Sequence, residues 1–414
     1  MKWIDRHLLW ASLVVGMAIV TTLVACGGGG STGGISMVTP VASPTPCGTM
    51  QPAGPASGQT RARLGAYYFD GWSGPLSNYH FNGLLNGPYQ SRKPLTGWQD
   101  NSSCAVEQQL AWAHKVGIDF FVFDWYYNAT VNDPGEDLNS AIAFTHALPD
   151  RHGMQYAILF VDSSPFVPPA TAWTSIINQW MTYMTDPAYV KVNGKPLLIV
   201  IDAGQMRNIF GSSAGVSNAL GQLRSAAVAQ GLPGVFVAAV FGVPEGSSGQ
   251  DSQFPDLSWI PGDGYDALST YNYPFTPTVV SGVLPYSSLA TAGQWMWSQC
   301  ALKCPLPTIP VVTDGWDPRP WNEADPTGHL MWYSRTPADV STDVNNTIML
   351  ASGNARLQVE PAPAPPMVIM EAWNELGEGS YIVPTVGDGT SYGDSLAALF
   401  GGPRAGIHRN RNYH

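Results

Sequence analysis

The chain has 414 residues, of which 44% are hydrophobic and only 12% are charged, and its formal net charge is −11. This length allows one large α/β domain with a substantial core, and the negative charge without a basic patch argues against binding to nucleic-acid backbones. Fifteen Trp and seventeen Tyr stand beside nineteen Lys plus Arg. This balance favours an aromatic-rich core and a largely neutral surface on which rings could stack against sugars.

The first residues predict an export signal. Lys2 and Arg6 precede an apolar run from Leu8 to Val24, and the sequence LVAC ends at Cys26. This pattern is typical of a bacterial lipoprotein signal over residues 1–26, with a lipid attached to the cysteine after cleavage. An ordinary cleaved signal and a single membrane anchor are the alternatives. We expect an exported protein that is lipid-anchored to the bacterial cell envelope, either periplasmic or at the cell surface.

Residues 27–60 are rich in Gly, Pro, Ser and Thr. Such a segment cannot bury enough apolar surface to fold, so we expect a flexible tether. The organisation after the tether is then one catalytic domain over residues 61–402 and a C-terminal tail over residues 403–414.

The five cysteines fit an exported protein. With Cys26 lipidated, four remain, and an oxidising compartment permits disulfides. Cys300 and Cys304 are close enough to pair at a helix end, which would leave Cys47 with Cys104, although the sequence alone allows three pairings. No histidine stands beside these cysteines at ligand spacing, which disfavours a zinc site. We expect neither a bound metal nor a cofactor.

From residue 61 onward, short apolar runs alternate with helical patterns. The runs are nearly continuous in hydrophobicity and rich in Val, Ile or aromatic residues, which is typical of strands buried on both faces. In chain order they are LGAYYF from Leu64, IDFFVFD from Ile118, YAILFV from Tyr156, PLLIVI from Pro196, VFVAAVF from Val235, DALSTY from Asp266, IPVVT from Ile309 and MVIMEA from Met367. The predicted helices span 104–116, 137–152, 171–183, 215–230, 289–302, 338–351 and 393–399. No regular helix is expected between Phe241 and Tyr265.

Eight strands in alternation with helices predict an α/β fold, a (β/α)8 TIM barrel with long βα loops. A doubly wound open sheet is the main rival. That fold usually has a glycine-rich turn after its first strand, and FDGWSG at this position is not a dinucleotide-binding fingerprint. The barrel is therefore favoured.

Acidic residues recur where the predicted strands end. In a barrel these ends meet at one mouth, where catalytic groups lie. The acids are Asp70, Asp124, Asp162, Asp202, Asp314, Asp317, Glu375 and Glu378. Some would instead cap the helices that follow, because Asp is a preferred N-cap residue.

Aromatic residues interleave with these acids in YYFDGW, FDWYYN, TYNY and GWDPRPWN. Strand residues alternate between the lumen and the helix layer, so part of this set belongs to the core. Rings around a carboxylate cluster are what a glycan-binding cleft offers. The candidates for substrate binding at these strand ends include Tyr68, Asp124, Tyr126, Asp317 and Asn374.

Two glutamates, Glu375 and Glu378, follow the eighth predicted strand. On a helical turn, residues three apart share a face with Cβ atoms about 5–6 Å apart. Cleavage of a glycosidic bond commonly uses two carboxyl groups, one protonated and one ionised. Gly377 and Gly379 leave room for a turn and for a ligand. The plain alternative is two surface acids in the first turn of a helix, where acids favour the dipole.

The segment AWNELGEGSYIVP resembles the closing motif of WbsX-type domains and of glycoside hydrolase family 99. GAYYFDGW, AWAHKVGIDFFVFDWYYN, YVKVNGKPLLIV and GWDPRPWN are similar to earlier blocks of the same families, in the same order. The resemblance spans residues 65–380. It departs from the family pattern at Leu376, Gly377 and Val383, where family 99 commonly has Trp, His and an acid.

The resemblance implies a (β/α)8 barrel that acts with retention on α-linked, mannose-type glycans. Glu375 would be the base that acts on the 2-hydroxyl of the substrate, and Glu378 would be the acid/base. Trp72, Trp125, Tyr271, Arg319 and Trp321 would line the subsites. WbsX-type domains have also been labelled glycosyltransferases.

The leading hypothesis is a surface-anchored, endo-acting retaining glycoside hydrolase whose partner is a polysaccharide or oligosaccharide. It would act as a monomer. A non-catalytic glycan-binding lipoprotein and a transferase that takes part in glycan assembly remain open. The chain has no evident Asp-x-Asp motif for a nucleotide sugar, which disfavours the transferase.

Overall fold

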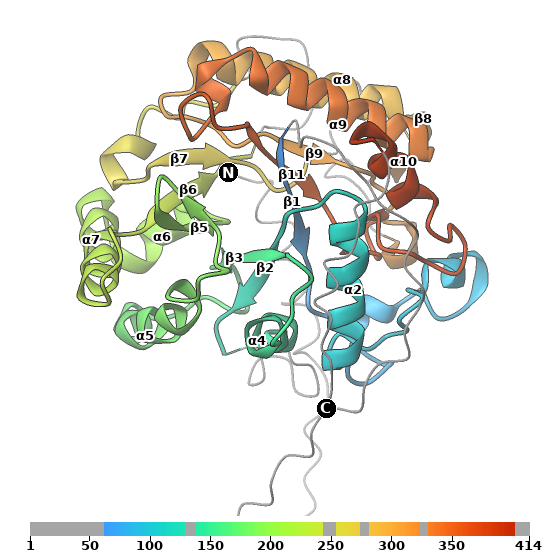
Figure 1. Ribbon diagram of the computed structural model, residues 1–414, viewed down its shortest axis with the longest axis horizontal. Helices are drawn as coiled ribbons and strands as arrows, with labels where there is room; N and C mark the ends of the chain where they lie inside the picture. The colour runs from blue at the N-terminus through green and yellow to red at the C-terminus, as the bar shows by residue number, and fades with distance from the viewer. Residues whose placement is uncertain (1–61, 129–137, 243–253, 274–280, 323–329, 402–414) are drawn as a thin grey trace, which may run out of the picture.

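The computed structural model describes residues 62–128, 138–242, 254–273, 281–322 and 330–401 (Figure 1). The predicted signal, tether and tail, with Cys26 and Cys47, lie outside the described residues, so export and lipid anchoring stay predictions. Within the described ranges, no helix is both long and apolar enough to span a membrane.

Eight parallel strands form a nearly closed barrel, which confirms the predicted TIM-barrel fold. They are β1 (Arg63–Tyr68), β2 (Phe120–Tyr126), β3 (Gln155–Val161), β5 (Lys195–Val200), β6 (Phe236–Val240), β7 (Ala267–Ser269), β9 (Val311–Thr313) and β11 (Met367–Glu371). Each strand pairs with the next barrel strand along the chain, apart from β7 and β9, and β11 returns to β1 with Ile369 opposite Gly65. Nearly all of these strand residues are buried, as continuous apolar runs require.

The junction between β7 and β9 closes the barrel through few hydrogen bonds. The backbone N–H of Leu268 donates to the carbonyl oxygen of Pro307 at 2.9 Å, and that of Ile309 donates to the carbonyl oxygen of Leu268 at 2.9 Å. The Ser269 hydroxyl adds a bond of 3.1 Å to the carbonyl oxygen of Ile309.

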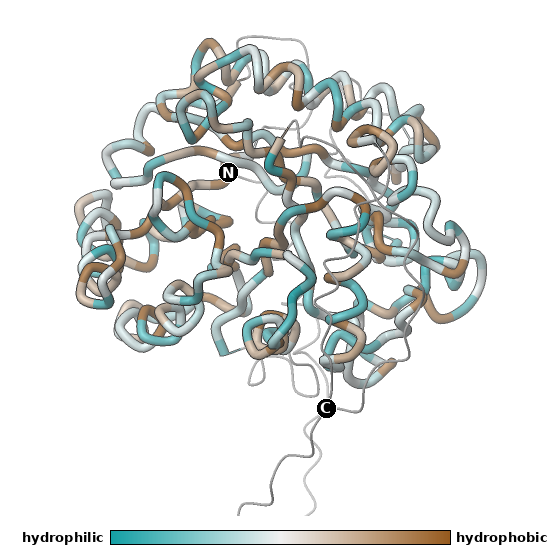
Figure 2. Tube along the Cα trace, viewed as in Figure 1, coloured by the Kyte–Doolittle hydropathy of each residue, from teal (hydrophilic) through white to brown (hydrophobic). Residues whose placement is uncertain are grey.

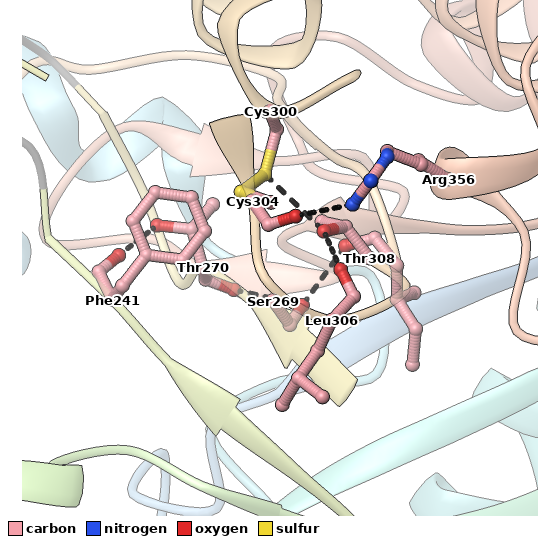
Figure 3. The surroundings of a disulfide bond; sticks show 9 residues. Phe241, Ser269, Thr270, Cys300, Cys304, Leu306, Thr308 and Arg356 are labelled. Atoms are coloured by element: carbon pink, nitrogen blue, oxygen red, sulfur yellow. Dashed lines mark hydrogen bonds between the residues drawn. A yellow bond between two sulfur atoms is a disulfide. The ribbon is translucent and has the colours of Figure 1, made fainter. Parts of the chain in front are cut away.

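A disulfide between Cys300 and Cys304 lies beside this junction (Figure 3). It joins the end of one helix to the residues that lead into β9. The Thr308 hydroxyl lies 3.2 Å from Cys300 Sγ, and Arg356 donates to the carbonyl oxygen of Cys304 at 2.7 Å. Cys104 is also disulfide-bonded, and its predicted partner lies outside the described residues.

Helices surround the barrel (Figure 1). They are α2 (Ser103–Lys115), α4 (Ser140–Ala147), α5 (Trp173–Met184), α6 (Ala203–Phe210), α7 (Ser213–Ala229), α8 (Tyr286–Lys303), α9 (Pro337–Ser352) and α10 (Ser391–Leu399). Figure 2 shows apolar residues along the central strands and a mixture of apolar and polar residues on the outer helices. In the described part of the link from β6 to β7, the helical element is a 3-10 helix, Ile260–Asp263.

Several small elements were not predicted from the sequence. A parallel pair, β8 (Gly282–Pro285) and β10 (Met331–Ser334), precedes α8 and α9. An antiparallel hairpin, β12 (Asn374–Glu375) and β13 (Ser380–Tyr381), follows β11. A short strand β4 (Lys191–Val192) pairs with β5, and 3-10 helices lie at Tyr79–Phe81, Gly87–Arg92, Ala170–Ala172, Arg319–Trp321 and Ala355–Leu357.

Candidate active site

The hairpin formed by β12 and β13 carries both glutamates, and we call it the glutamate hairpin. Glu375 lies on β12 opposite Ser380, and Glu378 lies in the turn. This hairpin replaces the helical turn considered from the spacing of the two residues. Gly379 has φ 74°, and a Cβ there would lie 2.7 Å from the Cβ of Asp317. Glycine is required because the backbone is left-handed and tightly packed.

Glu375 is 6% exposed and shares a hydroxyl with a second acid. The Tyr271 hydroxyl lies 2.8 Å from Glu375 Oε1 and 3.1 Å from Asp124 Oδ2. Tyr271 follows β7 and Asp124 lies on β2, so the barrel brings three distant parts of the chain together. Burial raises the pKa of Glu375 to about 7, while the bond from Tyr271 opposes this shift. Burial and then the charge of Glu375 raise the pKa of Asp124 well above its usual range.

The hydroxyl of Tyr271 carries one proton for two acid contacts. It donates that proton to one carboxylate, so the second contact is a hydrogen bond only if the other carboxyl donates to the phenolic oxygen. The shorter contact is to Glu375, and Asp124 Oδ1 has no hydrogen-bond partner among the described residues, which makes an ionised Asp124 costly. The arrangement therefore fits a neutral Asp124 that donates to Tyr271, which in turn donates to an ionised Glu375.

Glu378 is 3% exposed and lies next to the end of β7 through Asn272, whose side-chain amide donates to Glu378 Oε2 at 3.3 Å. The backbone of Glu378 accepts a hydrogen bond from the N–H of Asp317, in the loop after β9. The two glutamates thus face different neighbours. A phenol and an acid surround Glu375, and an amide contacts Glu378.

Arg92 connects the glutamate hairpin to the loop after β9, where Arg319 also contacts Asp317. Arg92 is buried and donates to the carbonyl oxygens of Leu376 at 2.9 Å and of Asp317 at 3.1 Å. Asp317 also accepts hydrogen bonds from the side chains of Arg92 and Arg319. The guanidinium of Arg319 lies 4.0 Å from the ring centroid of Trp332. This network places Asp317 and Arg319 against each other at the edge of the site.

Trp321 packs directly on the turn between the glutamates. Its ring occupies the space that a Cβ on Gly377 would need. The indole N–H donates to the carbonyl oxygen of His80 at 2.9 Å, which fixes the orientation of the ring. Glycine at this position lets the tryptophan approach the backbone between Glu375 and Glu378.

Several predicted substrate-binding residues have their polar atoms hydrogen-bonded inside the protein. The Asn374 amide exchanges two hydrogen bonds with the backbone of Phe69, at 2.9 and 2.8 Å. Trp72 is fully buried and donates to the carbonyl oxygen of Asn374, and the Tyr68 hydroxyl donates to Asp100. The binding roles of these residues stay predictions.

The two aromatics on β2 face different surroundings. Trp125 is 2% exposed and packs against Trp180 of α5, with ring centroids 5.3 Å apart. Tyr126 packs against Phe166, and its hydroxyl lies 3.5 Å from Asp124 Oδ2. Strand alternation explains the split, because neighbouring residues point to opposite faces. Of the predicted residues, the structure therefore gathers Asp124, Tyr126 and Tyr271 around Glu375.

The other strand-end acids serve local structure. Asp70 accepts a hydrogen bond of 2.5 Å from the N–H of Ala141, at the start of α4. Asp202 caps α6 by accepting from the N–H of Gln205, as expected for part of this set. Asp162 is fully buried and accepts from the N–H of Asp202, and burial raises its pKa.

Some residues at the site were missed as candidates from the sequence. Asn272 and Arg92 contact the glutamate hairpin, and Glu371 contacts Ser380 of the same hairpin. Only Glu371 carried a signal, because a charged residue inside an apolar strand buried on both faces needs an explanation.

Comparisons with known proteins support the fold. The family model described as "Glycosyltransferase WbsX" matches residues 167–396. A solved structure titled "Glycoside hydrolase-like protein" aligns with a TM-score of 0.53 at 15% identity, over 87% of this chain and 97% of that chain. A GH99 endo-alpha-mannosidase from Bacteroides thetaiotaomicron aligns with a TM-score of 0.50 at 15% identity, over 78% of this chain and 87% of that chain. A search of curated proteins gave no match.

Proposed function

Because this chain belongs to the WbsX family, we propose that it is a glycan-active enzyme, a retaining glycoside hydrolase for α-linked, mannose-type polysaccharide. The enzyme would cleave bonds within the polysaccharide and not at its ends. One observation carries the proposal: two buried glutamates share a hairpin at the barrel mouth, and Tyr271 joins one of them to Asp124. The two carboxyl groups have different hydrogen-bond partners, a phenol at Glu375 and an amide at Glu378, and acid and base roles call for carboxyl groups in different environments.

Glu375 is the proposed base and Glu378 the proposed acid. In the first step Glu375 takes the proton of the 2-hydroxyl, and the freed oxygen bonds to C1 of the same sugar. The bond from C1 to the leaving oxygen breaks, and that oxygen receives the proton of Glu378. In the second step Glu378 takes a proton from water, and the water oxygen bonds to C1. The bond from C1 to the 2-oxygen breaks, and this oxygen recovers its proton from Glu375.

The neutral Asp124 supports the role of Glu375. A second negative charge beside Glu375 would make that carboxylate harder to ionise, whereas a protonated Asp124 strengthens the hydrogen bond from Tyr271. The base must be ionised before it can accept a proton. Activity is therefore expected to fall below about pH 7, the value to which burial raises the pKa of Glu375.

The first prediction concerns the two glutamates. Glu375→Gln and Glu378→Gln should each lower turnover by about 10²–10⁴-fold, because each removes one proton-transfer group. The test is incubation with a panel of α-mannans and bacterial exopolysaccharides, followed by sizing of the products and assay of new reducing ends. Glu107→Gln, a change on the outer helix α2, serves as the control. Wild-type rates in either hairpin variant contradict the assigned roles.

The printed description of the family favours a second candidate, a glycosyltransferase. It would use the same carboxyl groups but give an extended glycan instead of a free reducing end. Product sizing with an added acceptor separates the two reactions. Glycan binding without any change in product size points instead to a non-catalytic binding protein.

A further inference from the structure

Glu371, the last residue of β11, is a third buried glutamate and is four positions from Glu375. It is fully buried, and Ser380 of the glutamate hairpin contacts it twice. Ser380 Oγ lies 2.6 Å from the carbonyl oxygen of Glu371 and 3.0 Å from its Oε2. The same hydroxyl lies 3.1 Å from Oδ1 of Asp314, which follows β9.

These three contacts need more protons than Ser380 has. A hydroxyl donates one hydrogen bond and accepts two, and a carbonyl oxygen can only accept. The shortest contact, to the carbonyl oxygen of Glu371, therefore takes the Ser380 proton. The two carboxyl contacts are hydrogen bonds only where a carboxyl group donates to Ser380 Oγ.

The surroundings place a proton on Glu371 before Asp314. Burial raises the pKa of Asp314 to about 8, but its Oδ1 lies 3.3 Å from the guanidinium of Arg335, which opposes that rise. Glu371 has no comparable cation, and its Oε1 has no hydrogen-bond partner within the described residues. A bare, charged carboxylate oxygen in a dry interior is far more costly than a neutral carbonyl oxygen.

We propose that Glu371 keeps its proton in the folded protein at neutral pH and acts as a positioning residue. As a neutral acid, it donates a hydrogen bond to Ser380 and so fixes the base of the glutamate hairpin. This proton assignment stands on the geometry of Glu371 alone, whereas its effect on turnover rests on the proposed function.

Every ionisable group that faces Glu371 favours the neutral form or leaves it undisturbed. Acidic groups lie on two sides, Asp314 after β9 and Glu375 on the glutamate hairpin, and the cation nearest to them in the described part of the chain, Arg335, contacts Asp314. The phenols of Tyr67 on β1 and of Tyr271 and Tyr273 after β7 complete the surroundings. Burial, then Asp314, then Glu375 raise the pKa of Glu371 well above its usual range, and the hydroxyls of Ser380 and Thr313 oppose this rise only in part. A neutral Glu371 also spares Glu375 a neighbouring negative charge.

The decisive experiment measures unfolding against pH and needs no substrate. An unfolded glutamate ionises near about pH 4.3, so a native Glu371 that stays neutral makes folding less favourable as pH rises above this value. The folding equilibrium constant of the wild type should then fall about ten-fold per pH unit relative to Glu371→Gln, between about pH 5 and pH 7. If the folding equilibrium constants of the wild type and Glu371→Gln change in parallel with pH, the proposal is wrong.

A matched control is Asp343→Asn on α9. Asp343 is a buried acid that Gln294 and Tyr286 hold, and burial raises its pKa to about 6. Its hydrogen bonds go to side chains of α8, Gln294 and Tyr286, and not to the glutamate hairpin. The folding equilibrium constant of the wild type relative to Asp343→Asn should stop falling near pH 6. Relative to Glu371→Gln, it should continue to fall above that pH.

A second readout separates positioning from simple packing. The amide of Glu371→Gln can still donate to Ser380, whereas Glu371→Met fills the space without a donor. On the most sensitive glycan of the panel, kcat for Glu371→Gln should exceed kcat for Glu371→Met at least ten-fold, and Asp343→Asn should match the wild type. Equal losses in the two Glu371 variants overturn the positioning role. If no glycan is cleaved, the unfolding curves alone decide the protonation state.

Discussion

At the scale of single residues, the hydroxyl of Tyr271 is the most consequential group at the site. It touches Glu375 at 2.8 Å and Asp124 at 3.1 Å, so it sets which of the two acids holds the proton. Its hydrogen bond opposes the rise in the pKa of Glu375 that burial causes. A phenol is suited to this position because it both donates and accepts.

Tyr271→Phe tests this interpretation. Without the donor, the pKa of Glu375 should rise further, and the acid limb of the kcat/KM profile should move to higher pH. We expect about a 10–100-fold loss at pH 7, which corresponds to about 1.4–2.7 kcal/mol. The control is Tyr127→Phe, three positions after Asp124 in the sequence and outside the hydrogen bonds that link Asp124, Tyr271 and Glu375. An unchanged pH profile in Tyr271→Phe contradicts the proton assignment.

At the residue scale, the sequence indicated which acids and which tyrosine lie at the barrel mouth but not the residues that support them. Counting polar residues at strand ends finds Asp124 and Tyr271, because the barrel brings the carboxyl ends of all strands to one mouth. It cannot find Arg92, which contacts Leu376 across 284 positions of sequence. It also cannot separate Trp125 from Tyr126, since the side to which each points depends on the register of β2.

At the scale of elements, the glutamate hairpin depends on an unusual approach of Trp321 to Gly377. A Cβ at this position would collide with the six-membered ring of Trp321, and part of the hairpin or the indole would have to shift. The hairpin has only two residues in each strand, so it has little of its own hydrogen bonding to resist such a shift.

Gly377→Ala should therefore disturb the site more than the fold. We expect a loss of about 1–3 kcal/mol in the free energy of unfolding, together with a fall in kcat. Gly221→Ala on α7 is the matched control, because nothing lies within 4 Å of a Cβ there. That change should stabilise the protein by about 0.4–1 kcal/mol. Chemical denaturation and kinetic assays of Gly377→Ala and Gly221→Ala test this prediction. Equal changes in stability and in kcat for the two variants contradict the close contact at Gly377.

The eight barrel strands were predictable because burial on both faces leaves a continuous apolar run for each. The elements that were missed are short, or they depend on pairing with distant segments of the chain. α6 spans eight residues, Ala203–Phe210, and begins at the capping residue Asp202 directly after β5. The pair β8 and β10 joins segments about 50 positions apart, and no local pattern encodes such pairing.

At the scale of the whole molecule, the interior holds many acids with raised pKa values. Burial raises the pKa of Asp100 and Asp343 to about 6, of Glu375 to about 7 and of Asp314 to about 8. In the unfolded chain these groups ionise near about pH 4. Each therefore contributes stability below that pH which is lost as pH rises through the raised value.

The protein should accordingly be most stable in mild acid. The midpoint of thermal unfolding should fall as pH rises from about 5 to about 8, with each buried acid contributing up to about 1.4 kcal/mol per pH unit over its own range. Calorimetry across this range checks the trend. Added salt should leave the slope nearly unchanged, because the acids are buried and weakly screened. A midpoint that rises with pH contradicts the protonation of these groups in the fold.

The position of the glutamate hairpin in the chain has a consequence for biosynthesis. β11 is the last of the eight barrel strands, and the hairpin follows it directly. A ribosome that has made the first seven strands has made Asp124, Tyr271 and Arg92 but neither glutamate. Under the proposed mechanism, a chain that stops before position 375 lacks both carboxyl groups, so only the finished protein is expected to cleave a glycan.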